Sequence, residues 1–392
     1  MKPLSVSVRS FSYSAIIYSA IIAVLAICVF GAGSVAAAPQ GLLEQLHKHA
    51  ILTSTVANNG DLNPYAVIIA PVSAGRISAG DVLVDNFNNV SNLQGTGTTI
   101  VDYNPATKKM TLFAKLSQQD PRCPGGVGLS TAMTMLKSGW IIVGSTPSTD
   151  GTTATKGNGC LFVLNPSGDV AAVWSGPNID DPWGNMATLD NGTTASLFIS
   201  MAGFDLPSPR VKDPATGAAV IVRKAKVLRL DLAITDGKVP VIQSQTVIAN
   251  GLPERADLDN FLFGPTGVAL GPDGTLYVSD GVGNRIIKID DAPTRTTSAG
   301  TGETLTINGL LKNPLSLIMA PNGHLLTCNG LNGQIVEIDP ATGKQIYAQW
   351  LDVDQAQTPP GNGDLFGLAV TPDGRALYYV EDDINALVEI TK

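Results

Sequence analysis

Short apolar runs separated by turn residues recur along the C-terminal half of the chain in three similar units. In each unit an apolar run leads through Pro-Asp-Gly or Pro-Asn-Gly into a second apolar run, and a third run alternates apolar and polar residues. The turn glycines Gly274, Gly323 and Gly374 are 49 and 51 residues apart. Asp-Gly and Asn-Gly favour tight hairpins because they tolerate positive φ, and alternation gives a strand one buried face. A repeat of this length, built from short strands, predicts a β-propeller.

Fainter copies of the same pattern extend toward the N-terminus, beginning near residues 64, 129 and 184, which brings the number of units to six. The last unit ends at Lys392 one strand short, and an unassigned strand candidate lies at residues 50–56. A strand from one terminus that completes the last blade would close the ring and remove an exposed edge. The sequence therefore predicts an all-β, six-bladed β-propeller over residues 50–392, closed by an N-terminal strand, with residues near 50–56 pairing with residues near 384–390.

The fourth unit resembles the NHL-repeat propellers through the segments 264–269 (GPTGVA), 276–280 (LYVSD) and 283–286 (GNRI). The fifth and sixth units are less similar to these repeats, and the first three share only the strand–turn–strand pattern. More distantly, the chain is similar to the SMP-30/gluconolactonase and strictosidine-synthase-like propellers. The resemblance implies a six-bladed propeller, which can serve as an interaction module or as an enzyme such as a metal-dependent lactonase.

The N-terminus predicts export. Lys2 and Arg9 precede an apolar stretch from about Ala15 to Phe30, and small residues follow up to Ala38. This order is typical of a signal peptide, so we assign residues 1–38 to a leader and 39–49 to a lead-in, and expect a secreted or periplasmic protein. An uncleaved anchor and a lipoprotein remain as alternatives.

The charge balance is acidic, with 33 Asp and Glu against 25 Lys and Arg. Loss of Lys2 and Arg9 with the leader would leave 23 basic residues, a net charge of −10. Such a surface disfavours nucleic acid and anionic membranes as partners. We therefore expect no nucleic-acid partner, no membrane contact beyond the leader, and a monomer.

Three cysteines follow the leader. Cys123 lies in the loop that enters the second blade, and Cys160 ends the loop between that blade's second and third strands. Both kinds of loop reach the same face of a propeller, so a disulfide between them is geometrically reasonable in an oxidising compartment. Two free thiols are the alternative. Cys328 falls on a strand and is expected to pack as a small apolar residue.

The loops on that face, here called the loop-rich face, differ in length between blades. Loops between second and third strands are long in the first three blades (86–97, 145–159 and 202–225) and short in the last three. Long entry loops at 251–263 and 352–364 lie on the same face. Loops on a rigid scaffold are where binding residues usually lie, so we expect a small-molecule or protein ligand there, with drift of surface insertions as the alternative.

Histidine scarcity excludes several chemistries. Beyond the leader the chain has only His47, His49 and His324, none of them placed at the loop-rich face. A Ser-His-Asp triad or a three-histidine zinc site cannot be assembled there.

Oxygen-bearing side chains remain as candidates. Entry positions of the inner strands carry Asn63, Asn185, Asn313 and Asp364, and the second strands end at Asp85, Asp280, Glu381 and Asp382. Carboxylate and amide oxygens at a channel mouth could hold a hard cation such as Ca²⁺. We assign Asn185, Asn313 and Asp364 as metal candidates, and Asp85, Asp280, Glu381 and Asp382 as ligand-binding candidates. Trp183, expected in an entry loop, is added as an aromatic contact. The alternative for Asp280 and Asn313 is a structural role in locking neighbouring blades.

These observations favour an exported propeller that binds a ligand or protein partner through its loop-rich face. The alternative is a metal-dependent hydrolase or lactonase with carboxylate and amide ligands at the mouth of the central channel.

Overall fold

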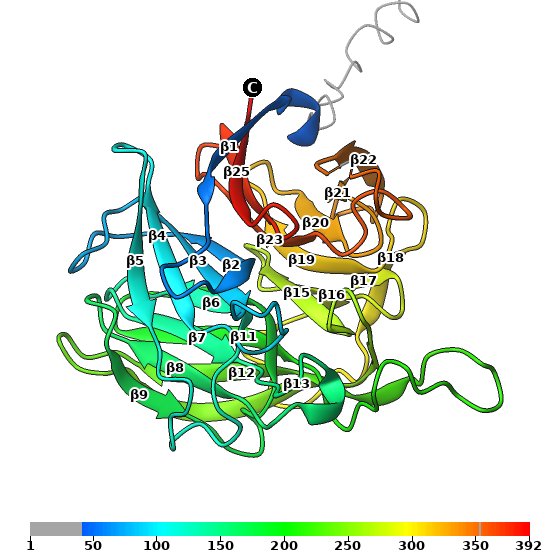
Figure 1. The fold of residues 1–392 in the computed structure, drawn as a ribbon, viewed down its shortest axis with the longest axis horizontal. Coiled ribbons are helices and arrows are strands. Elements are labelled where there is room, and N and C mark those ends of the chain that lie inside the picture. The colour runs from blue at the N-terminus through cyan, green and yellow to red at the C-terminus, as the bar shows by residue number, and fades with distance from the viewer. Residues whose placement is uncertain (1–40, 353) are drawn as a thin grey trace, which may run out of the picture. The chain divides into compact units, whose positions relative to one another are not determined.

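The computed structural model describes residues 41–352 and 354–392, and Gly41–Lys392 form one compact unit. The expected leader lies outside the described residues. Within these described residues, two short 3₁₀ helices, η1 (Leu43–Gln45) and η2 (Thr153–Thr155), accompany 25 strands in six antiparallel sheets. The protein is therefore a six-bladed β-propeller, with each sheet forming one blade (Figure 1).

The first three blades follow the chain in order, each running from its innermost to its outermost strand. Blade one contains β2 (Leu62–Ile69), β3 (Val82–Asn88), β4 (Thr99–Asn104) and β5 (Lys109–Lys115). Blade two contains β6 (Leu129–Met135), β7 (Ile141–Ser145), β8 (Cys160–Leu164) and β9 (Val170–Trp174). Blade three contains β10 (Pro182–Asp190), β11 (Thr194–Met201), β12 (Val222–Ala233), β13 (Val241–Ala256) and the short β14 (Leu262–Phe263).

The last three blades correspond to the three clear repeats. Blade four contains β15 (Pro265–Leu270), β16 (Leu276–Asp280), β17 (Arg285–Ile289) and β18 (Glu303–Ile307). Blade five contains β19 (Pro314–Met319), β20 (Leu325–Asn329), β21 (Gln334–Ile338) and β22 (Gln345–Trp350). Blade six contains β23 (Leu365–Val370), β24 (Ala376–Glu381), β25 (Ala386–Thr391) and, outermost, β1 (Lys48–Ser54).

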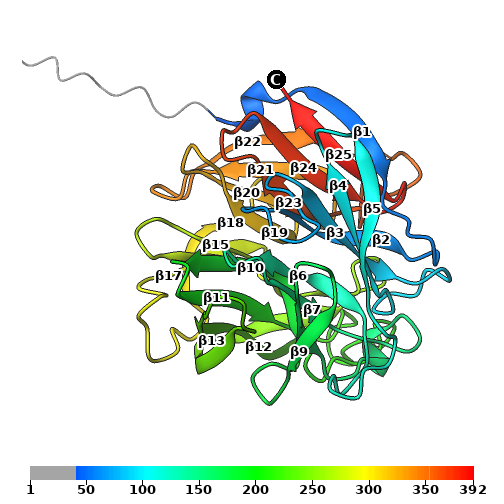
Figure 2. The same ribbon diagram turned by 90° about the vertical axis from the view of Figure 1, so that its left-hand side faces the viewer.

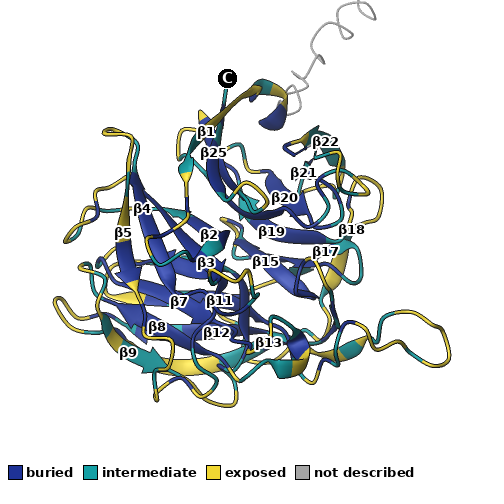
Figure 3. Cartoon of the chain, in the orientation of Figure 1, coloured by how far each residue is buried: buried dark blue, intermediate teal, exposed yellow. Residues whose placement is uncertain are grey.

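The innermost strands surround a central axis. Each of β2, β6, β10, β15, β19 and β23 packs against the next, and β23 packs against β2, so the ring is closed (Figures 1 and 2). Burial follows this order, because inner strands lie between neighbouring blades while outer strands such as β9 face solvent on one side (Figure 3). The ring provides a rigid frame for the loops at its two ends.

Strands from the two ends of the described chain lie side by side in blade six. β1 pairs antiparallel with β25, from Lys48 opposite Thr391 to Ser54 opposite Ala386 (Figure 2). Just before β1, the buried carboxylate of Glu337 accepts hydrogen bonds from the backbone N–H groups of Leu42 and Leu43 at 2.8 and 2.9 Å. This segment is thus held to blade five as well as to blade six.

Two loop features of blades two and three bear on the site. Cys123 and Cys160 form a disulfide with their Cα atoms 5.4 Å apart, while Cys328 is buried with a free thiol. The expected entry loop at 251–263 contains more strand than the sequence pattern suggested, because β13 continues to Ala256 and pairs with β14. This pairing holds the two ends of the 257–261 loop together.

Within residues 41–352 and 354–392, no helix has the length and hydropathy needed to cross a membrane.

Candidate functional site

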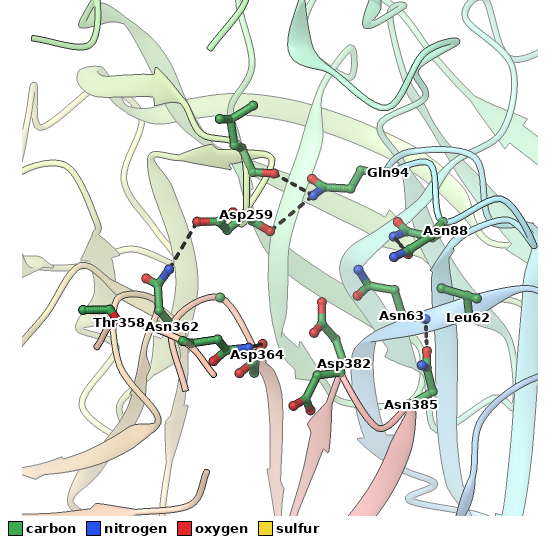
Figure 4. A pocket seen from close by; sticks show the side chains of 15 residues that line it. Leu62, Asn63, Asn88, Gln94, Asp259, Thr358, Asn362, Asp364, Asp382 and Asn385 are labelled. Atoms are coloured by element: carbon green, nitrogen blue, oxygen red, sulfur yellow. Dashed lines mark hydrogen bonds between the residues drawn. The ribbon is translucent and has the colours of Figure 1, made fainter. Parts of the chain in front are cut away.

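A cavity of about 490 Å³ opens on the loop-rich face above the central axis. Its walls come from the start of β2, the β3–β4 loop, the β13–β14 loop, the β22–β23 loop and the β24–β25 turn (Figure 4). We call this space the acidic cavity. Its lining residues are Leu62, Asn63, Asn88, Asn92, Gln94, Leu258, Asp259, Gln357, Thr358, Asn362, Gly363, Asp364, Asp382, Asp383 and Asn385.

A group of carboxyl groups gathers at one side of the acidic cavity. Oxygen atoms of Asp352, Asp364 and Asp383 all lie within 4.8 Å of one another. Asp352 and Asp364 are buried, and each has one carboxyl oxygen with no hydrogen-bond donor among the described residues. No ion pair within the described part of the chain involves any of the three, so the protein itself does not neutralise this group.

Burial and crowding raise the pKa of Asp364 and of the nearby Glu381. Burial, followed by the neighbouring Asp352, Asp382 and Asp383, raises the pKa of Asp364 to about 9, against one lowering hydrogen bond from Gln357. Burial followed by the charges of Asp352 and Asp383 raises the pKa of Glu381 to about 8. A carboxyl group with a raised pKa holds its proton at neutral pH unless a cation takes the proton's place.

Asp382 projects into the middle of the acidic cavity, between Asp364 and Asn63 (Figure 4). Burial and the adjacent Asp383 raise its pKa to about 7, although hydrogen bonds with Asp364 and Asn63 act in the opposite direction. The pKa of Asp383 is raised by burial and by Asp352. The end of β24 therefore carries three consecutive acidic residues, each with a raised pKa.

Amide side chains form much of the remaining wall, and the NH₂ groups of Gln94, Asn88 and Gln357 donate to protein acceptors. Gln94 Nε2 donates to the carbonyl oxygens of Leu258 and Asp259 at 3.1 and 3.2 Å. Asn88 Nδ2 donates to Asn92 Oδ1 at 2.6 Å, and Gln357 Nε2 donates to Asp364 Oδ1 at 2.8 Å. These bonds fix the orientation of the three amides, and their oxygen atoms receive no hydrogen bond from the described residues.

The oxygen atoms that remain are buried and have no donor among the described residues. They belong to Asn63, Asn88, Gln94 and Gln357, and the free carboxyl oxygen of Asp364 joins them. A buried acceptor without a donor costs about 1–3 kcal/mol, so native proteins rarely keep several of them together without bound water or a ligand. The acidic cavity is therefore rich in acceptors and poor in donors.

A layer of aromatic rings closes the channel beneath the acidic cavity. Tyr65 stacks on Phe87 and Phe366 with centroids 4.3 and 3.9 Å apart, and Trp183 and Phe261 complete the layer. All five rings are buried. We call these residues the aromatic floor.

Asp85 lies close to the aromatic floor and is fully buried. One of its oxygens accepts from the N–H of Ala66 at 2.8 Å, and the other has no donor. Burial raises its pKa to about 8 against the effect of that hydrogen bond. Its charge, like that of Asp382, raises the pKa of Tyr65, which places both acids near this ring.

The residues expected from the sequence divide into two groups. Asp364, Asp382 and Glu381 come together at the acidic cavity, and Asn63, named among the entry positions, lines it as well. Trp183 is fully buried in the aromatic floor and contributes no ring to the cavity wall.

The other expected residues lie elsewhere. Asp280 is buried and pairs with Arg285 at 2.8 Å, and it accepts from the N–H of Gly283 at 2.8 Å, so it locks its own loop. The N–H of Asn313 donates to Asn284 Oδ1, and Asn313 does not line the cavity. Asn185 donates to the carbonyl oxygens of Val268 and Leu317 and lines a different cavity at the other end of the ring.

Several residues of the site were not anticipated. Asp352 entered only as the first residue of the 352–364 loop, and Asp383 was not singled out. Asn88, Gln94 and Gln357 belong to long expected loops whose course the strand pattern does not fix. One signal was available for Asp383, since the run Glu381-Asp382-Asp383 is the only three-acid run of the sequence.

Comparisons with known proteins show structures of similar fold but identify no sequence family. No family model and no curated protein matches the sequence. Among solved structures, a gluconolactonase from Xanthomonas campestris superposes with a TM-score of 0.54 at 11% identity, covering 89% of this chain and 91% of its own. A calcium-binding regucalcin from Agrobacterium tumefaciens gives 0.51 at 13% identity, covering 88% and 93%.

A luciferin-regenerating enzyme gives a TM-score of 0.52 at 12% identity, covering 88% of this chain and 96% of its own. The structural neighbours are thus SMP-30/gluconolactonase-like six-bladed propellers. At these identities the likeness concerns the fold alone, and the NHL similarity of the fourth blade stays a resemblance.

Proposed function

We propose that the protein binds a small polar ligand in the acidic cavity together with a divalent cation, which its oxygen ligands suggest is Ca²⁺. The observation that carries this proposal is the convergence of Asp352, Asp364 and Asp383 within 4.8 Å, with no basic residue paired to any of them in the described chain. Ca²⁺ takes six to eight oxygen ligands from carboxylates, amides and water.

The donor set fits a hard cation. Asp352 and Asp364 are buried with an unused oxygen each, and the amide oxygen of Gln357 is a further acceptor beside Asp364. A bound cation would supply positive charge among the carboxyls and would displace the proton that the raised pKa of Asp364 retains. The chain itself provides the positions of these oxygens and the loops that keep them there.

The ligand class follows from the unsatisfied acceptors. A molecule that meets Asn63, Asn88 and Gln94 must bring donors, because the NH₂ groups of Asn88 and Gln94 are occupied and Asn63 bonds to Asp382. Hydroxyl groups satisfy this condition. Anionic ligands are disfavoured, because four carboxyl groups and no Lys or Arg line the cavity.

Calorimetric titration of the purified protein with CaCl₂ tests the cation. We expect one saturable site per chain, weakened about tenfold or more by Asp364→Asn, because this change removes a buried charged ligand. Asp236→Asn, on an exposed turn of blade three, is the matched control and should bind as the unaltered chain does. Equal affinity for all three proteins, or no binding, would contradict the proposal.

A second candidate is a metal-dependent hydrolase, favoured by one observation in addition to the neighbours' fold. The pKa of Asp382 is raised to about 7, and a carboxyl with a pKa near the working pH is suited to accept a proton from an attacking water. Asp382 points into the cavity, so a substrate carbonyl held there would be within its reach (Figure 4). In this role Asp382 would be the base, and the cation would polarise the carbonyl oxygen.

Hydrolysis of aldonolactones and aryl esters, followed in a pH-stat with Ca²⁺ and then with a chelator, separates the two functions. Turnover that disappears with chelator and with Asp382→Asn, while Ca²⁺ still binds that variant, supports the hydrolase. Ca²⁺ binding without turnover on either substrate class supports the binding function alone.

A further inference from the structure

A second cavity occupies the opposite mouth of the central channel. It measures about 660 Å³ and is lined by the far ends of the innermost strands β2, β6, β10, β19 and β23 and by the β2–β3 turn. Because Asn63 and Tyr65 lie toward the other end of β2, the aromatic floor separates this cavity from the acidic one. We call it the apolar cavity.

The walls of the apolar cavity carry no charge. Its described lining residues include no Asp, Glu, Lys, Arg or His, although the whole chain has 33 acidic and 25 basic residues. Four of the chain's seven methionines line it: Met133, Met135, Met186 and Met319. Methionine side chains are apolar and flexible, so such a wall adapts to the shape of an apolar guest.

The few polar groups in this cavity already have partners. Thr134 Oγ1 bonds to Thr188 Oγ1 at 2.9 Å, and Thr131 bonds to the carbonyl oxygen of Trp183. Asn185 spans three blades, because Nδ2 donates to Val268 and Leu317 of blades four and five while its oxygen accepts their N–H groups at 3.3 Å. None of the lining residues has a buried polar atom without a partner.

This is the reverse of the acidic cavity, where buried acceptors lack donors. A ligand of the apolar cavity meets no charged side chain and no unpaired buried side-chain polar atom, so charge on the ligand brings no gain. The volume lies within the range of about 300–1,000 Å³ that is usual for small-molecule sites, which are mostly apolar with a few placed polar groups.

We propose that the apolar cavity is a second binding site, separate from the acidic cavity, for a small uncharged apolar molecule. Its affinity should come from apolar surface removed from water, and it should not depend on Ca²⁺, because no carboxyl group faces it. The proposal does not rest on the proposed function of the acidic cavity.

Fluorescence titration with the neutral probe N-phenyl-1-naphthylamine tests this site on the purified full chain. We expect saturable binding of one probe per chain, weakened about tenfold by Ala79→Trp, because the indole fills the rim of the cavity. Ala79 lies on an exposed turn, so the change should leave the fold intact. Ala215→Trp, at an exposed position of the 202–221 loop, is the matched control and should bind the probe normally.

Methionine methyl resonances locate the probe independently. In a chain labelled with [methyl-¹³C]methionine, the probe should shift the signals of Met133, Met135, Met186 and Met319 and leave those of Met110 and Met201 in place. Addition of a chelator, and Asp364→Asn, should not change the probe affinity.

Three results would overturn the proposal. The first is no saturable binding, and the second is binding that shifts Met110 or Met201 instead of the four lining methionines. The third is probe affinity that falls as protein concentration rises while sedimentation detects a dimer, because then a second copy of the chain covers this mouth.

Discussion

The backbone N–H of Asp382 donates to the carbonyl oxygen of Asp364 at 3.1 Å, which ties the end of β24 to the entry of β23. The same bond recurs in the two preceding blades, from Gly281 to Gly264 and from Gly330 to Asn313, at 3.0 Å each. This backbone bond joins the first two strands in all three blades. In blade six the two residues that make it are Asp364 and Asp382, which both carry carboxyl groups. The repeat supplies the positions, and blade six alone among these three places acids at both.

The first prediction concerns the pH dependence of stability without cation. The pKa of Asp364 is raised from 3.8 to about 9, so the folded protein holds a proton that the unfolded chain releases at much lower pH. The folded state then binds more protons, and the free energy of unfolding should fall as pH rises from about 5 to 9. Urea denaturation in chelator at pH 5, 7 and 9 measures this.

Asp364→Asn should make that fall shallower, because the amide does not titrate while Glu381, Asp382 and Asp85 still do. Saturating Ca²⁺ should also make it shallower. A free energy of unfolding that rises with pH over this range, or a slope unchanged in Asp364→Asn, would contradict the assignment of the raised pKa.

The second prediction uses two asparagines in equivalent positions. Asn63 and Asn313 both precede a proline at the start of an innermost strand, and both have positive φ, 60° and 54°. Glycine tolerates this conformation, so each can be replaced by Gly with little strain. Asn63→Gly should weaken Ca²⁺ or ligand binding several-fold, because it removes an acceptor and a hydrogen bond to Asp382.

Asn313→Gly should leave binding unchanged, because Asn313 does not line the acidic cavity. Calorimetry on both variants makes the comparison. If the two changes weaken binding equally, the effect comes from the backbone of the entry position and not from the amide in the cavity.

The third prediction concerns the N-terminal segment. Glu337 is fully buried and accepts from Leu42, Leu43, Asn322 and His324. Glu337→Ala should therefore lower the free energy of unfolding by about 2–4 kcal/mol, because several buried donors lose their partner. Glu303→Ala removes an exposed carboxylate 3.4 Å from Lys288 and should cost no more than about 1 kcal/mol. Urea denaturation that gives equal losses would show that Glu337 does not hold the segment.

The fourth prediction concerns the Cys123–Cys160 disulfide, which closes a loop of 37 residues. In the chain-entropy model a loop of this length stabilises the folded state by roughly 3–4 kcal/mol. The double variant Cys123→Ser with Cys160→Ser should lose about that amount in urea denaturation. A reductant should destabilise the unaltered chain but have no further effect on the variant, and a reductant that destabilises both equally would point to another cause.

The architecture could be derived from sequence because it depends on local patterns that repeat. Hairpin turns at Gly274, Gly323 and Gly374 recur at a near-constant spacing, and alternation fixes which face of each strand is buried. The positions of Asp364 and Asp382 could be predicted from the same repeat, because Asp364 directly precedes the first strand of the sixth unit and Asp382 directly follows its second strand.

The rest of the site depends on loops, whose course no periodic pattern fixes. Gln94 reaches the acidic cavity because the 86–97 loop folds back to meet Leu258 and Asp259, about 160 residues away in the chain. Trp183 and Asn185 were expected at the loop-rich face, but the structure places them elsewhere. Both lie near the start of β10, but the ring of Trp183 is buried in the aromatic floor and Asn185 lines the other mouth.

Crystals of the protein grown with CaCl₂, and measured at a long wavelength where calcium scatters anomalously, test the central claim most directly. We predict an anomalous peak in the acidic cavity at roughly 2.3–2.6 Å from an oxygen of Asp364, with Asp352 or Asp383 as a further ligand. A peak at any other site, or none under conditions in which calorimetry records binding, would contradict it.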